Sequence, residues 1–159
     1  MAGTLAAVER VLEIGSVNIN GTVRGLFPGA DYTGIDIVAG EGVDVVADGA
    51  TYTPPDGEFF DLIISTEVLE HAENAPLILA NAYRLLRPGG VLILTAAGEG
   101  RRPHSAVDGG ELRPGEFYRN VTRALLAAWL APFAVSLIQE TPPPPGGEAD
   151  IYALAIKGV

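Results

Sequence analysis

The sequence predicts an α/β fold in which a mostly parallel, seven-stranded sheet lies between two outer layers. Two observations lead to this prediction. Apolar runs rich in β-branched residues alternate with segments of helical periodicity, which is typical of parallel strands joined by helices. The last two apolar runs have no helical segment between them, and this predicts an antiparallel hairpin at the C-terminal edge of the sheet.

Each strand is predicted from a short apolar run bounded by turn residues. The strands of the parallel part are expected over 10–15, 32–38, 43–48, 59–65 and 91–96. Runs such as Leu62-Ile63-Ile64 are apolar at every position, which indicates burial on both faces of the sheet. The hairpin strands are expected over 133–139 and 151–156, joined by the proline-rich segment 140–147.

Three helices are predicted from apolar residues that repeat at helical spacing. They are expected over 20–27, 75–86 and 115–131. A proline shortly after each segment marks its end. Phe117 and Tyr118 in the third segment are expected to pack beneath the edge of the sheet, and the alternative is that Tyr118 or Arg119 contacts the acceptor.

Length and composition limit the domain organisation and the chemistry. The 159 residues, 48% of them hydrophobic, suit a single domain over 1–159. No apolar run reaches the roughly 18 residues of a membrane span. The start Met1–Thr4 lacks the features of a signal peptide, so we expect a cytoplasmic protein without a membrane partner. The absence of cysteine excludes disulfides, zinc–thiolate sites and thiol catalysis.

The charge balance argues against a nucleic-acid partner. The formal net charge is -10, and Lys157 is the only lysine. Affinity for nucleic acids rests largely on contacts of lysine and arginine with phosphates. The adjacent Arg101 and Arg102 offer a local basic patch, but the sequence as a whole predicts no nucleic-acid partner.

Glycine and acidic residues stand at the expected carboxyl ends of the first strands, where open α/β sheets bind ligands. Gly15 follows the first strand and lets the backbone approach a ligand closely. Asp36 ends the second strand, where a carboxylate can accept hydrogen bonds from both ribose hydroxyls. These two features fit NAD, FAD or S-adenosylmethionine, and each also occurs without a ligand.

Three further features distinguish between these cofactors. Glu13 favours the cationic amino group of a methionine moiety and repels a pyrophosphate. Asp48, at the end of the third strand, can accept a hydrogen bond from an adenine amino group. Val17 and Asn20 stand where the dinucleotide fingerprint has glycines, and the Val17 side chain blocks the approach of a pyrophosphate. S-adenosylmethionine is therefore the expected cofactor, with NAD as the alternative.

Five motifs follow one another in a specific order and spacing. They are E-x-G at 13–15, G-I-D at 34–36, V-A-D at 46–48, F-D-L-I-I-S-T-E-V-L-E-H at 60–71 and L-L-R-P-G-G-V-L-I-L at 85–94. Together they resemble the class I S-adenosylmethionine-dependent methyltransferases of the type 11 group. The resemblance runs from about residue 10 to residue 97, and it implies a Rossmann-like three-layer sandwich.

The resemblance also implies which residues line the cofactor site. They are Glu13, Gly15 and Ser16 at the methionine end, Asp36 at the ribose, Asp48 and Gly49 at the adenine, and Ser65 beneath the sulfonium. Val17, Asn20 and Ile37 complete the expected cofactor site. The first motif departs from the common E-x-G-x-G-x-G of the family, because Val17 and Ile19 replace the later glycines. This departure bears on the shape of the loop and on cofactor affinity.

Four residues with acid–base or metal-binding side chains follow the fourth and fifth strands. They are Glu67, Glu70, His71 and His104. The hypothesis we adopt makes His71 or His104 a general base for a hydroxyl acceptor, oriented by Glu67 or Glu70. A second hypothesis makes the set ligands of manganese, iron or zinc. A third treats them as ordinary helix-start and loop residues. The adopted hypothesis requires no metal.

The expected reaction is O-methylation of a small-molecule or glycan-like acceptor. Without an inserted lid, the acceptor site is expected to be open, to be completed by a second subunit in a homodimer, or to suit a large or carrier-bound substrate. Two other classes stay open on the sequence alone. One is a nicotinamide-dependent oxidoreductase, and the other is a non-catalytic Rossmann-like binding module.

Overall fold

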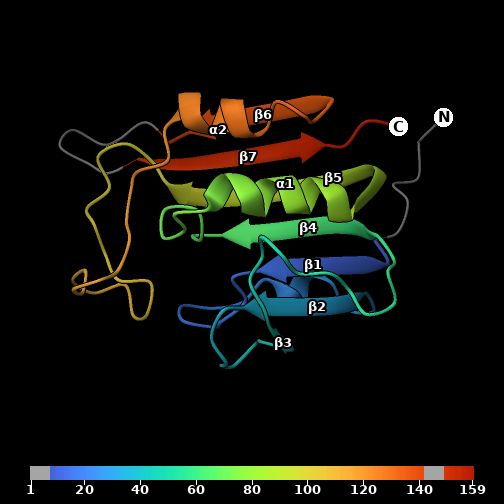
Figure 1. Cartoon of the computed structure of the whole chain (residues 1–159), viewed down its shortest axis with the longest axis horizontal. Coiled ribbons are helices and arrows are strands. Elements are labelled where there is room, and N and C mark those ends of the chain that lie inside the picture. Colours follow the sequence, from blue (N-terminus) through green and yellow to red (C-terminus); the bar gives the residue numbers. More distant parts are fainter. Residues whose placement is uncertain (1–7, 142–148) are drawn as a thin grey trace.

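The computed structural model describes residues 8–141 and 149–159, and these contain a seven-stranded sheet in the order β3-β2-β1-β4-β5-β7-β6 (Figure 1). The strands are β1 (Arg10–Ile14), β2 (Asp31–Asp36), β3 (Val45–Val46), β4 (Phe60–Thr66), β5 (Leu86–Ala97), β6 (Val135–Glu140) and β7 (Asp150–Ile156). The first five run parallel, and β7 is antiparallel to both β5 and β6. The predicted α/β fold with its C-terminal antiparallel hairpin is confirmed.

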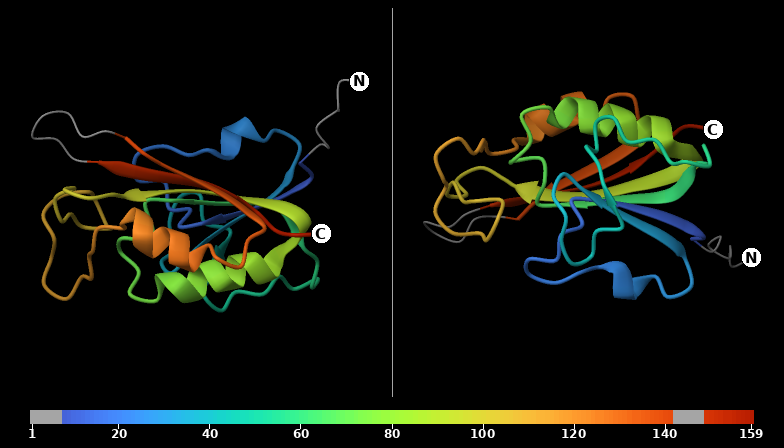
Figure 2. Two further views of the ribbon diagram at one scale, coloured as in Figure 1. Left: turned by 90° about the horizontal axis from the view of Figure 1, so that it is seen from above. Right: turned by 60° about the horizontal axis from the view of Figure 1, so that its bottom comes forward.

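One face of the sheet is covered by two α-helices, α1 (Ala75–Leu85) and α2 (Arg123–Trp129) (Figure 2). Ile78 and Leu79 of α1 and Leu126 of α2 are buried in the same core as Leu12 and Leu92 of the sheet. Helix α1 has a proline in its first turn, where a missing N–H costs nothing. The apolar residues that predicted a helix over 75–86 therefore form the face of α1 that packs on the sheet.

Within the described ranges, only the part of the opposite face around β1, β2 and β4 is covered, by the chain between β1 and β2, which contains the 3₁₀ turn η1 (Arg24–Leu26) (Figure 2). Val23 and Phe27 of this segment pack on a small cluster around Leu62. The α-helix predicted over 20–27 is therefore wrong. Two glycines in the segment, each costing about 1 kcal/mol in a helix relative to alanine, and the proline that follows explain the short turn.

The helix predicted over 115–131 is also shorter in the structure, where α2 begins at Arg123. Tertiary hydrogen bonds hold the preceding residues in a loop: the Arg119 amide donates to the Glu70 carbonyl at 2.9 Å and the Val121 amide donates to the Ala97 carbonyl at 2.8 Å. Thr122 then caps α2, since its hydroxyl accepts from the Leu125 amide. The loop places its side chains at the carboxyl edge of the sheet.

The strand order reverses between β1 and β4, so the loops after these strands and their neighbours meet at one edge of the sheet (Figure 1). No helix in the described ranges is long and apolar enough to cross a membrane. The start Met1–Thr4 and residues 142–147 of the proline-rich connection lie outside the described residues.

Candidate active site

The turn after β1 requires glycine at its first position. Gly15 has φ +81°, and a Cβ atom there would come within 2.1 Å of Val68 Cγ2. The amides of Gly15 and Ser16 both donate to the Ile35 carbonyl, at 2.9 and 3.1 Å, which ties the turn to β2. The left-handed backbone and the contact with Val68 therefore account for glycine at this position, and the close approach of a ligand there stays a prediction from the sequence.

Replacing Gly15 by alanine is expected to lower the free energy of unfolding by about 2–4 kcal/mol, from the left-handed backbone and the overlap with Val68. Urea unfolding measures this change. Gly57→Ala is the matched control, because Gly57 has φ +70° and no atom within 4 Å of an added Cβ. It should cost only about 1–2 kcal/mol. Equal losses in the two variants would show that the Val68 contact is not a constraint.

Asp36 ends β2 with its carboxylate fixed by two backbone amides. Val17 donates to Oδ2 at 3.3 Å and Val38 donates to Oδ1 at 3.1 Å. Ile37, beside it, is 73% exposed, and Val38 after it is exposed as well. An acid next to an exposed apolar side chain is a suitable surface for a ribose and its adenine.

Asp48 and Gly49 follow β3 and lie close to the start of α1. The exposed carboxylate of Asp48 accepts from the Ala50 amide at 2.8 Å and from Asn74 Nδ2 at 3.4 Å. Gly49 is buried, its carbonyl accepts from Asn81, and a Cβ atom there would lie 2.7 Å from Ile14 Cγ2. Packing is therefore a sufficient reason for glycine at this position.

Glu13 is buried in β1, on the face covered by the chain between β1 and β2. The Tyr32 hydroxyl donates to its Oε2 at 2.8 Å, and burial raises the pKa of the Glu13 carboxyl above its ordinary value. Sequence reasoning missed Tyr32 as the partner of this carboxylate. Tyr32 begins the predicted strand 32–38, and in the parallel pair of β1 and β2 it lies beside Val11, two residues before Glu13.

Two buried serines flank the end of β1, and neither hydroxyl has a hydrogen-bond partner among the described residues. Ser16 follows Gly15, and Ser65 lies beside Ile14 in the parallel pair of β1 and β4. Buried polar atoms without partners are rare in proteins and call for an explanation such as a ligand. Together with the fixed carboxylate of Asp36, they fit an adenosyl cofactor that carries a polar amino-acid end.

Glu67 follows β4 in a strained backbone conformation, with φ 55°, and it is the only described residue other than glycine with a positive φ. Its carboxylate accepts from the Thr95 hydroxyl at 2.8 Å and lies 3.6 Å from the Arg101 guanidinium. The left-handed region costs a non-glycine residue roughly 1–2 kcal/mol. Strain of this kind concentrates at functional sites, and here it directs an exposed carboxylate to the carboxyl edge of the sheet.

Glu70 is completely buried in the turn that precedes α1. The Ala97 amide donates to its Oε1 at 3.0 Å, whereas Oε2 has no partner in the described ranges. Burial, together with the neighbouring Glu67 carboxylate, raises the pKa of Glu70 to about 8. The buried carboxyl group therefore has too few hydrogen-bond donors around it to stabilise its charged form.

The two histidines, expected at the same end of the sheet, lie in contact. Their ring centroids are 4.8 Å apart, edge to face, and Tyr118 packs on both rings at 5.5 and 5.0 Å. His104 Nδ1 lies 3.0 Å from the Arg102 carbonyl. Burial and the neighbouring His104 lower the pKa of His71 to about 4. Tyr118, expected beneath the sheet edge, instead joins this cluster at the carboxyl ends of the strands.

A cleft of about 540 Å³ opens beside this cluster. Its wall includes Glu67, His71 and His104, and also Ile19 and Asn20 from the chain that follows the Gly15 turn. The cleft therefore joins the predicted cofactor loop to the predicted catalytic residues. Residues of the loop after β5, including Arg101 and Arg102, form the rest of the wall.

The sequence profile of a methyltransferase domain family matches residues 12–94, more than half of the chain. The chain belongs to this methyltransferase domain family. Its membership confirms the predicted class, an S-adenosylmethionine-dependent methyltransferase. No curated protein matches the chain significantly.

Solved structures share the fold of this methyltransferase domain at low sequence identity. The N-methyltransferase NodS from Bradyrhizobium japonicum WM9, in complex with S-adenosylhomocysteine, has a TM-score of 0.67 and 20% identity over 95% of this chain and 79% of its own. The 1,6-didemethyltoxoflavin-N1-methyltransferase of Burkholderia thailandensis, with its acceptor and S-adenosylhomocysteine bound, has a TM-score of 0.69 and 22% identity over 94% and 71%. The N-terminal domain of EvdMO1 with S-adenosylhomocysteine has a TM-score of 0.68 and 19% identity over 94% and 75%.

Proposed function

We propose that the chain acts as one domain that transfers a methyl group from S-adenosylmethionine to a hydroxyl of a small-molecule or glycan-like acceptor. The observation that carries this proposal is the cleft shared by the cofactor loop and the two histidines. S-adenosylmethionine, when bound, supplies an electrophilic methyl group on a sulfonium. The transfer needs mainly alignment of acceptor and donor, and the adjacent cleft would provide it.

The cofactor would lie across the carboxyl ends of β1 and β2. Asp36 would accept hydrogen bonds from the ribose, Ile37 and Asp48 would contact the adenine, and the hydroxyls of Ser16 and Ser65 would pair with the methionine end. Binding would then satisfy two buried hydroxyls that have no partner among the described residues. Asn20, in the wall of the cleft, would lie between the cofactor and the acceptor.

His104 is the better candidate for the general base. If its Nδ1–H donates to the Arg102 carbonyl, Nε2 keeps the lone pair that can take a proton from an acceptor hydroxyl. The Arg102 carbonyl would then take the orienting role that the sequence suggested for Glu67 or Glu70. Glu67 contacts Thr95 and Arg101, and it would instead shape the wall of the cleft.

An amine acceptor is the second candidate, because two of the structural neighbours are N-methyltransferases by name. A neutral amine already carries the attacking lone pair, so it depends less on a base than a hydroxyl does. The homodimer and the absence of a nucleic-acid partner stay predictions from the sequence.

Methyl transfer to acceptors grouped by nucleophile tests the proposal. The purified chain is incubated with S-adenosylmethionine and with matched phenols, alcohols, sugars and amines, and S-adenosylhomocysteine and the product are identified by mass spectrometry. We expect methyl ethers from at least one hydroxyl class. Methylamines alone would favour the second candidate, and cofactor binding without product from any class would favour a binding module.

A further inference from the structure

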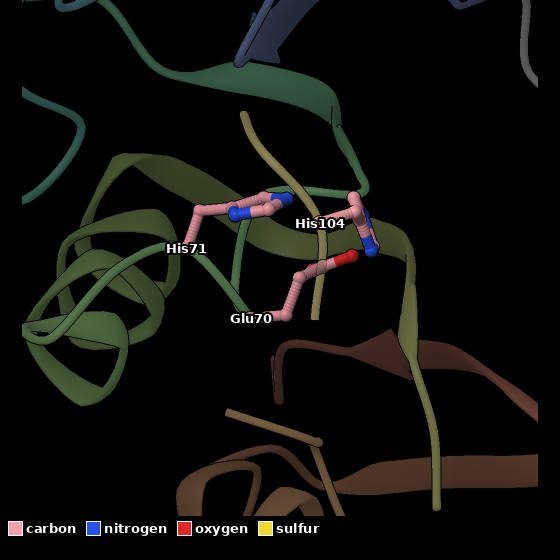
Figure 3. A group of neighbouring side chains, drawn as sticks. All are labelled: Glu70, His71 and His104. Carbon is pink, nitrogen blue, oxygen red and sulfur yellow. The ribbon is translucent and has the colours of Figure 1, made fainter. Parts of the chain in front are cut away.

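Three metal-binding donor atoms converge at Glu70, His71 and His104 (Figure 3). One carboxylate oxygen and one nitrogen from each imidazole lie within 4.8 Å of one another. The donors come from two segments far apart in sequence, the turn before α1 and the loop after β5. One carboxylate with two imidazoles is a donor set that zinc and related divalent transition-metal ions take in proteins.

Two of the donor groups contain buried polar atoms without partners among the described residues. Glu70 is 0% exposed, and its Oε2 is unpaired although its Oε1 accepts from Ala97. Figure 3 shows the Glu70 carboxylate directed toward the ring of His104. His71 Nδ1 is buried and unpaired as well. Unpaired buried atoms cost free energy, and a cation bound between these side chains would remove that cost.

A backbone carbonyl orients the third donor, His104. His104 Nδ1 lies 3.0 Å from the Arg102 carbonyl, so a proton on Nδ1 leaves Nε2 free to coordinate. Histidines that bind metals in proteins usually donate their second ring N–H in this way. The structure therefore supplies both the ligand and the outer hydrogen bond that fixes its tautomer.

Glu67, the fourth residue of the set considered from the sequence, is not one of the converging donors. Its carboxylate is engaged by Thr95 and Arg101. Three protein ligands leave one position of a tetrahedral ion open, and the cleft lined by His71 and His104 adjoins it.

We propose that Glu70, His71 and His104 bind one divalent transition-metal ion, with zinc as the best match to the donor set. Ligand atoms of tetrahedral zinc lie roughly 3.3 Å apart, so the widest pair must close by about 1.5 Å, within the range of side-chain rotation. The chain has no cysteine and no other histidine, and thus no competing thiolate or imidazole site.

Occupancy has a consequence that rests on the proposed function. The ion would take the Nε2 lone pair that His104 needs as a base, so bound zinc should inhibit methyl transfer and a chelator should restore it. Binding of the ion is measured without turnover, and the two proposals can therefore fail separately.

Cobalt(II) titration of the chelator-treated full chain tests the site, because tetrahedral cobalt has visible absorption bands that octahedral cobalt in water shows only weakly. We expect one equivalent to bind, zinc to displace it, and magnesium not to displace it. His104→Gln and the isosteric Glu70→Gln should each weaken binding at least about tenfold. Glu111→Gln, an exposed carboxylate in the wall of the same cleft, is the matched control and should bind as the unaltered chain does.

Circular dichroism and thermal unfolding establish that each variant is folded before its affinity is compared. The titration of the unaltered chain needs no variant, so the proposal stays testable if a substitution prevents folding. Absence of tetrahedral cobalt bands, or equal affinity in His104→Gln and Glu111→Gln, would overturn the site. Zinc that binds at the site without lowering turnover would support the site and contradict the assignment of His104 as the base.

Discussion

His104→Gln is expected to lower kcat by about 10²- to 10⁴-fold, the range that general-base catalysis contributes. Glutamine is similar in size but has no basic lone pair on nitrogen, so it cannot take the acceptor proton. The dissociation constant of S-adenosylmethionine should stay the same, because the expected cofactor contacts lie at the carboxyl ends of β1, β2, β3 and β4 and not in the loop after β5. Steady-state kinetics and calorimetry on the same preparation measure the two quantities.

Glu9→Gln is the control for this variant, since Glu9 is exposed directly before β1, at the end of the strand away from the cleft. It should change kcat by less than a few fold. A His104→Gln protein with near-normal kcat and normal structure would exclude His104 as the base. Equal losses in kcat and in cofactor affinity would instead indicate a structural role for the loop after β5.

Asp36→Ala is expected to weaken S-adenosylmethionine binding by about 100-fold or more. The carboxylate would accept two hydrogen bonds from the ribose, and hydrogen bonds to charged groups contribute about 1.5–3 kcal/mol each. The substitution also removes the carboxylate to which the Val17 and Val38 amides donate, and this loosens the turn that follows β1. Isothermal titration calorimetry measures the change in Kd.

Asp31→Ala provides the matched control, because Asp31 begins the same strand at the opposite edge of the sheet and pairs with Arg10. It should leave the Kd within about twofold, as expected for an exposed ion pair far from the ligand. A loss of less than threefold in Asp36→Ala would contradict the placement of the ribose on β2.

Much of the sheet could be predicted because its strands have simple local causes. The run around Leu62-Ile63-Ile64 is apolar at every position, and the structure buries it between the helical layer and the chain that follows β1. The end of α1 was likewise marked by the proline and glycines that follow it. Patterns of this kind depend on neighbouring residues alone, so the sequence carries them directly.

The elements that could not be predicted depend on contacts between distant segments. Residues 115–122 have helical periodicity, but the Arg119 and Val121 amides bond to Glu70 and Ala97 and hold the chain in a loop. The convergence of Glu70 with His104 depends on the same loop and on the position of β5 beside β4. The sequence could name the candidate residues, but it could not tell which of them meet.

Calorimetric titration of the purified chain with S-adenosylmethionine, with NAD as the competing ligand, tests whether the carboxyl edge of the sheet binds this cofactor. We expect one equivalent to bind in the micromolar range, S-adenosylhomocysteine to bind similarly, and NAD to give no heat. If S-adenosylmethionine does not bind to the folded chain, the loop with Val17 and Ile19 does not accept this cofactor. Heat from NAD would contradict the choice between the two cofactors.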